Sequence, residues 1–181
     1  MTTLVHDAAT NSGDIQLASF YVADALMGVS IDQIEEINHH LKVTPVPHAP
    51  PWVRGVMNLR GAVITVIDLR VALGLEPTAV SRKTRTVVVR SRGEPIALLV
   101  DRVADVVSAP ANEIEPPPAN VVGADGRLFR GVYKLDRELL VILDADAVLA
   151  ADAVIAPAAP EGETSDVSIG QLRSMVGRVE G

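Results

Sequence analysis

The sequence of 181 residues contains no cysteine. Disulfide bonds, thiolate nucleophiles and cysteine-based zinc sites are therefore excluded. Aromatic residues are also scarce: they make up 3% of the chain, whereas hydrophobic residues make up 48%. The core must therefore be filled by aliphatic side chains, and the many β-branched ones among them favour strands.

Long apolar runs and a basic face are missing as well. No stretch approaches the roughly 18 consecutive apolar residues of a membrane-spanning helix, and residues 1–14 lack the features of a secretion signal. The formal net charge is −7, while nucleic-acid binding requires a basic surface. We therefore expect a cytoplasmic protein with no direct membrane insertion and no nucleic-acid partner.

Positive charge is concentrated in one short stretch of the chain. Its members are Arg82, Lys83, Arg85, Arg90 and Arg92. Two interpretations remain open for this stretch: a basic surface that docks an acidic partner, or a solvated linker followed by the exposed face of a strand.

Sequence motifs for catalysis and metal binding are absent. No serine lies in a G-x-S-x-G turn, and no glycine-rich loop ends in Gly-Lys-Ser or Gly-Lys-Thr to hold phosphate. The histidines have no metal-binding spacing such as H-E-x-x-H. They are His6, His39, His40 and His48. We expect no catalytic residue, no metal and no cofactor.

The sequence contains an internal duplication. Residues 31–37 (IDQIEEI) align with residues 100–106 (VDRVADV) at an offset of 69, so that apolar residues fall on apolar ones and an acid on an acid. Further along, Arg54-Gly55-Val56 aligns with Arg130-Gly131-Val132 at an offset of 76. Each copy also has a proline-punctuated connector, which forces extended backbone.

Short β-type runs bounded by glycine or proline recur in both copies. They are residues 15–21, 29–31, 56–59, 62–67, 86–90, 96–100, 131–135 and 139–143. The runs predict an all-β domain over residues 15–150 with two interleaved lobes, one at about 15–83 and the other at about 84–150. Residues 1–14 form an N-terminal tail in this interpretation.

Each copy ends with a strand, an aspartate and a short helical stretch. Asp68 and Asp144 are predicted to cap these helices by accepting hydrogen bonds from the first turn, and Gly74 to end the first one in a left-handed conformation. Residues 151–166 have the composition of a flexible linker. Beyond it, apolar residues at helical spacing leave two alternatives open, a short amphipathic helix and a frayed tail.

Two acid pairs are the only candidates for general acid–base chemistry. They are Asp32 with Glu36, and Asp101 with Asp105. Catalytic acid pairs are normally asymmetric, with environments that separate their pKa values, whereas these acids occupy matching positions in two copies. The duplication therefore favours an architectural role, and we expect that the protein is not an enzyme.

Several ordered segments resemble one known family. Residues 51–61 (PWVRGVMNLRG), followed by 66–70 (VIDLR), resemble the signature of CheW-like proteins, the coupling proteins of bacterial chemotaxis. Residues 28–37 and 100–106 look like two further segments of that family. The resemblance extends over roughly residues 15–149, which is most of the chain.

The resemblance implies a fold and a role. The fold is two pseudo-repeated SH3-like five-stranded barrels packed together, with short helices at the end of each copy and a flexible C-terminal tail. The role is a non-enzymatic adaptor in signal transduction. Its implied partners are the regulatory domain of a chemotaxis histidine kinase and the cytoplasmic tip of a chemoreceptor.

The family's interaction residues carry over to five positions of this sequence. They are Ile34, Glu36, Gly55, Arg60 and Val106. Arg60 either binds a carboxylate or carbonyls of a partner, or pairs internally with Glu36. Ile34 and Val106 are either apolar anchors or core residues. Gly55 and its mate Gly131 are expected to allow a tight backbone bend.

Two other functions remain as alternatives. One is a paralogue of the same family that serves a kinase pathway of surface motility or development. The other, from a different class, is a β-barrel that binds a small ligand.

Overall fold

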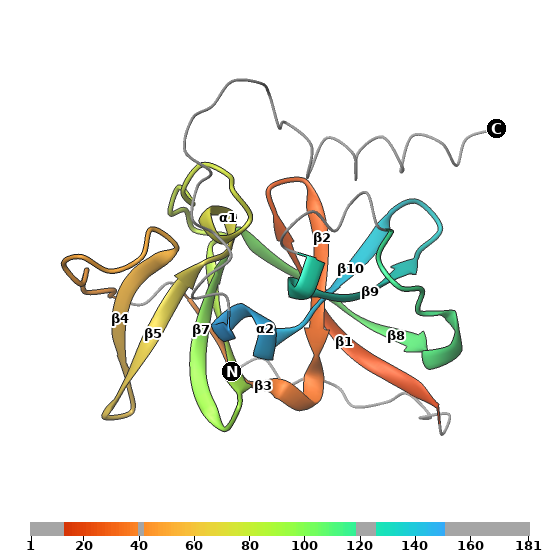
Figure 1. Ribbon diagram of the computed structural model, residues 1–181, viewed down its shortest axis with the longest axis horizontal. Helices are drawn as coiled ribbons and strands as arrows, with labels where there is room; N and C mark the ends of the chain where they lie inside the picture. The colour runs from red at the N-terminus through yellow and green to blue at the C-terminus, as the bar shows by residue number, and fades with distance from the viewer. Residues whose placement is uncertain (1–12, 40–41, 119–125, 151–181) are drawn as a thin grey trace.

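The computed structural model describes residues 13–39, 42–118 and 126–150, which form ten strands and several short helices (Figure 1). The strands are β1 (Asp14–Val22), β2 (Ala25–Ser30), β3 (Ile34–His39), β4 (Val53–Leu59), β5 (Ala62–Asp68), β6 (Arg85–Ser91), β7 (Glu94–Val100), β8 (Arg102–Pro110), β9 (Phe129–Lys134) and β10 (Leu139–Leu143). The helices are α1 (Leu69–Ala72), α2 (Ala145–Ala150) and the 3-10 turns η1 (Ile31–Gln33), η2 (Ala111–Glu113) and η3 (Gly126–Leu128). The all-β prediction is confirmed.

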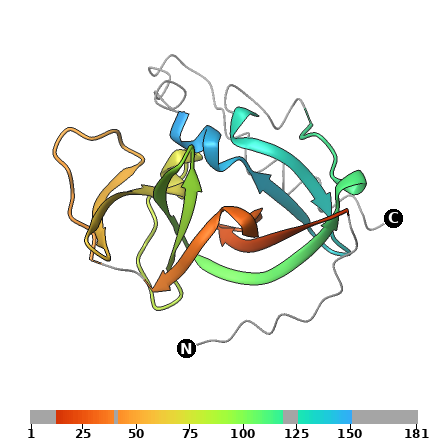
Figure 2. The same cartoon turned by 90° about the horizontal axis from the view of Figure 1, so that it is seen from below.

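The strands form two five-stranded sheets, each curled into a barrel. One has the order β3-β6-β7-β5-β4 and is called the central barrel; the other has the order β8-β1-β2-β10-β9 and is called the terminal barrel. Thr44 bridges to Val56 and closes the central barrel, while Glu115 bridges to Val132 and closes the terminal one. Figure 2 shows the curvature of both sheets side by side. Closure matters because it covers sheet edges that would otherwise pair with other chains.

The barrels do not coincide with the two copies of the duplication. The first copy supplies β1 and β2 to the terminal barrel and β3 to β5 to the central one, and the second copy does the reverse. The barrels therefore consist of residues 34–100 and of residues 14–30 with 102–143, whereas the expected bounds of the two interleaved lobes were about 15–83 and 84–150. The physical reason is that the chain crosses between the barrels in the middle of each copy, at η1 and at Asp101.

The largest core lies between the barrels. Successive side chains of a strand point to opposite faces of its sheet. In β7, Ala97 and Leu99 therefore fill the central barrel, while Leu98 and Val100 face the core between the barrels. In β10, Leu140 and Ile142 fill the terminal barrel and Leu143 faces the shared core. Strands buried on both faces appear in the sequence as continuous apolar runs.

Two strands were missing from the sequence-based prediction, namely β3 and β8. Both contain acids, Glu35 and Glu36 in β3 and Asp105 in β8, and both are edge strands with one exposed side. Each contains a bulge at the same position of the repeat, beside Glu35 in β3 and beside Ala104 and Asp105 in β8. The bulges shift the alternation of buried and exposed side chains, which hides the strand period.

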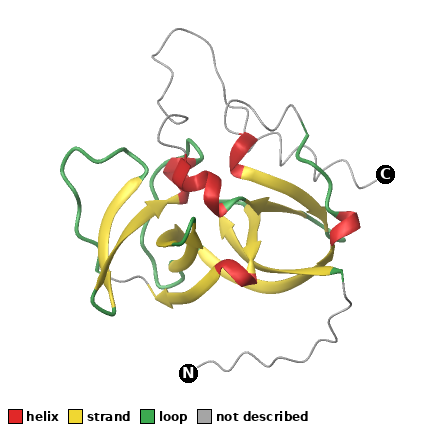
Figure 3. Ribbon diagram, turned by 60° about the horizontal axis from the view of Figure 1, so that its bottom comes forward, coloured by secondary structure: helices red, strands yellow, loops and turns green. Residues whose placement is uncertain are grey.

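The helix caps are confirmed. Asp68 accepts a hydrogen bond from the backbone N–H of Arg70 at 3.1 Å, and Asp144 accepts from Asp146 at 3.0 Å and Ala147 at 3.2 Å. Gly74 has a φ of +75° after α1. Both helices lie between the barrels (Figure 3) and bury apolar side chains in the shared core.

Some predicted features lie outside the described residues: the N-terminal tail up to residue 12, the linker after Ala151, the C-terminal helix, His6 and His40. No helix in the described part of the chain is long and apolar enough to cross a membrane.

Candidate functional site

Arg60 lies in the tight turn between β4 and β5. Arg60 has a φ of +52° and Gly61 a φ of +90°, as a two-residue hairpin turn with a left-handed backbone requires. The N–H of Gly61 donates to Oδ1 of Asn58 at 2.9 Å, which fixes the turn. The side chain of Arg60 is 82% exposed, so the turn presents it to solvent.

Glu36 is the partner of Arg60 within the chain. Glu36 pairs with Val88 across β3 and β6, so its side chain lies on the same side as Val88, toward the interior of the central barrel. Its Oε2 forms an ion pair with Nη2 of Arg60, and its Oε1 accepts a hydrogen bond from Asn38. The internal pairing expected as one alternative for Arg60 is therefore present.

This ion pair joins the two edges of the central sheet. Glu36 lies on β3 and Arg60 follows β4, and these two strands are the outermost strands of the sheet. We call this contact between Glu36 of β3 and Arg60 after β4 the seam. Because Arg60 is largely exposed, the pair contributes at most about 1 kcal/mol to stability. The guanidinium has five N–H donors, and several of them remain available to a partner.

Gly55 has a structural role at the closure of the central barrel. A Cβ at this position would lie 2.2 Å from the backbone oxygen of Thr44, and its φ is +145°. At the mate Gly131, a Cβ would lie 2.7 Å from Cγ2 of Ile114 and 2.9 Å from the backbone oxygen of Glu115. Both glycines let the closing segment cross the strand closely, and Gly55 also lies at an irregularity of β4, where the register shifts between Val53 and Gly55.

The two apolar candidates differ in burial. Ile34 is half-buried against the core between the barrels, whereas Val106 is 46% exposed on β8. The mate of Val106 in the first copy is Ile37, which is 41% exposed on β3. Ile37 pairs with Val87 and Val106 with Ala18, so each lies on the side of its sheet that continues into the shared core.

Ile37 was therefore missed as a candidate. The signal was present in the sequence, because the offset of 69 relates Ile34 to Val103 and Ile37 to Val106. In each copy the first residue packs against the shared core and the second is exposed. The structure assigns Ile34 to the core and Val106 to the surface.

The acid pairs do not form a catalytic arrangement. Asp101 accepts hydrogen bonds from the backbone N–H of Ala23 at 2.5 Å and from Nε of Arg70 at 2.9 Å. Asp32 and Asp105 are exposed. Within the described residues, no group of three or more histidines and acids has a geometry that could hold a metal ion.

The basic residues of the stretch 82–92 lie at opposite ends of β6. Arg85 lies at the start of this strand and donates to the backbone oxygens of Arg82 at 2.7 Å and Thr84 at 2.9 Å. Arg90, near the other end, forms an ion pair with Glu35. These contacts favour the solvated interpretation of the stretch.

The comparisons with known proteins agree with one another, because the family model describes a CheW-like domain and two relatives are CheW proteins. The family model of the CheW-like domain matches residues 16–153. The probable chemotaxis protein CheW of Rhizobium etli is 31% identical over 138 residues, which cover 76% of this chain and 89% of that protein. The chemotaxis protein CheW of Bacillus subtilis is 35% identical over 130 residues, which cover 72% of this chain and 83% of that protein.

A solved structure agrees with these relatives. The scaffolding protein TtCheW from Thermoanaerobacter tengcongensis matches with a TM-score of 0.70 and 30% identity, over 75% of this chain and 92% of that chain. The match confirms that the two barrels are SH3-like. The chain belongs to the CheW-like family of chemotaxis scaffold proteins.

Proposed function

We propose that this protein is a non-enzymatic, cytoplasmic adaptor that couples chemoreceptors to a chemotaxis histidine kinase. The kinase binds at the seam through Arg60, with Glu36 as the partner of Arg60 within the chain, and Gly55 keeps the barrel beside the seam closed. The receptor binds at the exposed apolar side that carries Val106 and Ile37, with Ile34 supporting that side from the core. The family membership supports the adaptor role.

The presentation of Arg60 is the observation that carries the kinase site. The turn holds the backbone of Arg60 in place while its side chain remains 82% exposed. A guanidinium held in this way binds a carboxylate or several backbone carbonyls with little loss of conformational freedom. The regulatory domain of the kinase supplies such acceptors in this proposal.

The experiment is a pull-down of the full chain against the regulatory domain of the cognate kinase. Arg60→Glu is expected to weaken binding at least roughly tenfold, because it places a carboxylate opposite the partner's acceptors. Arg137→Glu is the matched control, since Arg137 is an exposed arginine in the equivalent turn of the terminal barrel. Unchanged binding by Arg60→Glu would contradict the proposed kinase site.

Glu36→Gln separates the two roles of Arg60. If Arg60 contacts the kinase directly, the loss of its internal partner leaves kinase binding intact, because the guanidinium is still present. If the ion pair acts only by fixing the turn, Glu36→Gln and Arg60→Gln weaken binding by the same factor. Equal losses would therefore reject direct contact by Arg60.

The receptor site is tested with a second pair of variants. Val106→Glu introduces a charge into the proposed apolar contact and is expected to weaken receptor binding roughly tenfold while leaving kinase binding unchanged. Val63→Glu is the control, because Val63 is 71% exposed on β5 of the central barrel. Receptor binding that responds to Val63→Glu but not to Val106→Glu would reject Val106 as a receptor contact and move the site to β5.

A further inference from the structure

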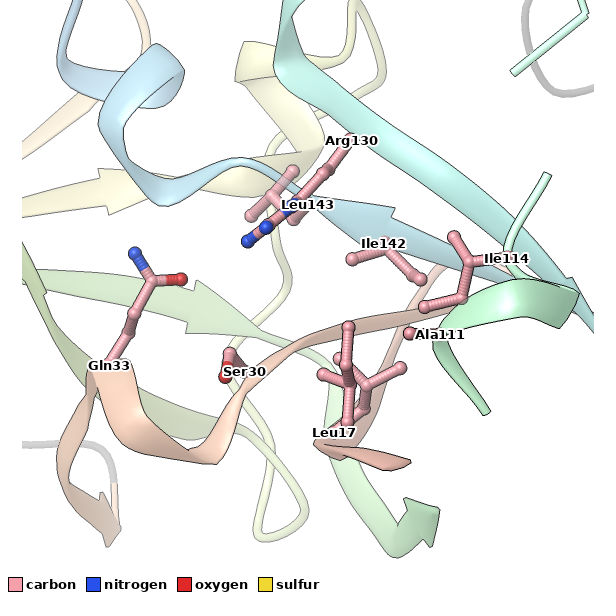
Figure 4. Close-up of a pocket in the computed structure, with 9 residues that line it drawn as sticks. Leu17, Ser30, Gln33, Ala111, Ile114, Arg130, Ile142 and Leu143 are labelled. Carbon is pink, nitrogen blue, oxygen red and sulfur yellow. The ribbon is translucent and has the colours of Figure 1, made fainter. Parts of the chain in front are cut away.

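The terminal barrel contains an open pocket that the proposed function does not use. Its volume is about 270 Å³, just below the usual range for drug-sized ligands and therefore suited to a small molecule. Leu17, Ile114 and Ile142 form its apolar part, and Ser30, Gln33 and Arg130 form its polar part. Figure 4 shows Arg130 extending from β9 toward the end that carries Ser30 and Gln33, with Leu143 beside it and Leu17, Ile114 and Ile142 at the other end.

Arg130 differs from its mate in the other copy. Nη1 of Arg54 lies 3.8 Å from Oδ2 of the buried Asp68, whereas the guanidinium of Arg130 forms no ion pair with any described residue. The corresponding aspartate, Asp144, caps α2 as Asp68 caps α1, but it forms no ion pair with Arg130. Arg130 is exposed, and within the described part of the chain its guanidinium has no acidic partner, so it is accessible to an external anion.

The pocket's own residues favour a negative ligand. None of the residues that line it is acidic, so Arg130 gives the pocket a local positive charge in a chain with a net charge of −7. The planar guanidinium binds a carboxylate through two parallel hydrogen bonds. The side-chain amide of Gln33 and the hydroxyl of Ser30 are further donors at the same end.

We propose that this pocket binds a short aliphatic carboxylate. The carboxylate lies against Arg130 with Gln33 and Ser30 as additional donors, and the hydrocarbon chain lies against Leu17, Ile114 and Ile142. A ligand of this size is expected to have a Kd on the order of 1 mM. The site is independent of the kinase and receptor contacts, because neither the seam nor Val106 contributes to the pocket.

The experiment follows binding of hexanoate to the full chain by two-dimensional amide NMR, with hexanol and hexylamine as ligands of similar length. Hexanoate is expected to shift the amides of Ser30, Gln33, Ala111 and Arg130 in a saturable way. Hexanol and hexylamine are expected to bind at least roughly tenfold more weakly, because they lack the charge that Arg130 recognises.

Three variants test the roles of charge and space. Arg130→Gln is expected to weaken hexanoate binding at least roughly tenfold, and Ala111→Leu to weaken it by filling the apolar end while keeping the charge. Arg137→Gln, which removes an exposed arginine outside the pocket, is expected to bind like the wild type. Each variant's amide spectrum also reports whether it is folded.

Several outcomes would overturn the proposal. They are an absence of saturable shifts at ten times the expected Kd, shifts at amides away from the pocket, equal affinity for hexanol, and unchanged affinity in Arg130→Gln. Because no kinase or receptor is present in the experiment, failure of the pocket and failure of the adaptor role are distinguishable.

Discussion

The two barrels share one backbone plan but differ in the charges on their surfaces. In the central barrel, Arg60 and Glu36 form the ion pair of the seam. The equivalent positions of the terminal barrel, at offsets of 76 and 69, are Asp136 and Asp105, which are both exposed acids. Two acids cannot form this pair, so the terminal barrel has no ion pair between these two positions.

A second difference concerns how each copy holds its first hairpin turn. The backbone N–H of Ala23, between β1 and β2, donates to Asp101, which Arg70 of α1 also holds. The equivalent N–H of Arg92, between β6 and β7, donates to Asp146 of α2 at 2.9 Å. The requirement for an acceptor at the turn is the same in both copies, but different residues supply it. The two copies therefore agree more closely in backbone conformation than in the side chains that accept hydrogen bonds from that backbone.

The closing glycines allow the largest test of this comparison. Gly55→Ala is expected to destabilise the protein by roughly 3 kcal/mol or more, because the new Cβ clashes with backbone at a φ of +145°. Gly131→Ala is expected to cost less, about 1–3 kcal/mol. Its nearest neighbour is a movable side-chain methyl of Ile114, and its backbone contact, the oxygen of Glu115 at 2.9 Å, is less close than the 2.2 Å at Gly55. Urea unfolding of the full chain measures both changes.

Gly13→Ala is the control, because a Cβ at Gly13 would have no neighbour within 4 Å. Equal losses at Gly55 and Gly131 would show that the two closures are energetically equivalent, contrary to this comparison. A loss at Gly55 below about 1 kcal/mol would mean that the segment around Thr44 moves away readily.

The capping aspartates allow a test of intermediate size. Asp68 is 1% exposed and also accepts hydrogen bonds from the N–H of Thr78 at 3.0 Å and the hydroxyl of Thr78 at 2.7 Å. Asp68→Ala is expected to cost about 2–4 kcal/mol, because it removes the cap and leaves buried donors of Thr78 without an acceptor. Asp144→Ala is expected to cost about 1 kcal/mol, since Asp144 is only half-buried and serves mainly as a cap.

Thermal unfolding of both variants checks this difference. Thr78→Val in the Asp68→Ala background is the informative control, because it removes the orphaned hydroxyl while keeping the size of the side chain. It is expected to recover part of the loss. No recovery would mean that the capping contact alone accounts for the cost.

The sequence predicted the strands of the interior better than those of the edges. Aliphatic runs such as residues 96–100 are buried on both faces, and their composition alone indicates a strand. In β3 and β8, bulges and acids break the two-residue period, so those strands were missed. The lobes were expected to be interleaved, but the strands that each barrel contains could not be predicted, because a repeat in the sequence shows which segments are equivalent and not which of them pair.

The candidate site was predicted only in part for the same reason. The pairing of Arg60 with Glu36 was one of two alternatives, since sequence spacing cannot show that β3 and the turn after β4 lie at opposite edges of one sheet. Ile34 and Val106 were grouped as equals, although the repeat relates Val106 to Ile37. Burial separates them, and burial depends on which barrel each strand enters.

The seam itself allows the smallest test. Asp136→Arg gives the terminal barrel the residue found at the equivalent position of the central one, opposite the exposed Asp105. The change in unfolding free energy is expected to lie within about 0.5 kcal/mol, because exposed ion pairs contribute little. Arg60→Ala is likewise expected to cost less than about 1 kcal/mol, despite the large loss of kinase binding expected for Arg60→Glu. A stability change above about 2 kcal/mol in either variant, measured by urea unfolding, would mean that the seam serves the fold and not the partner.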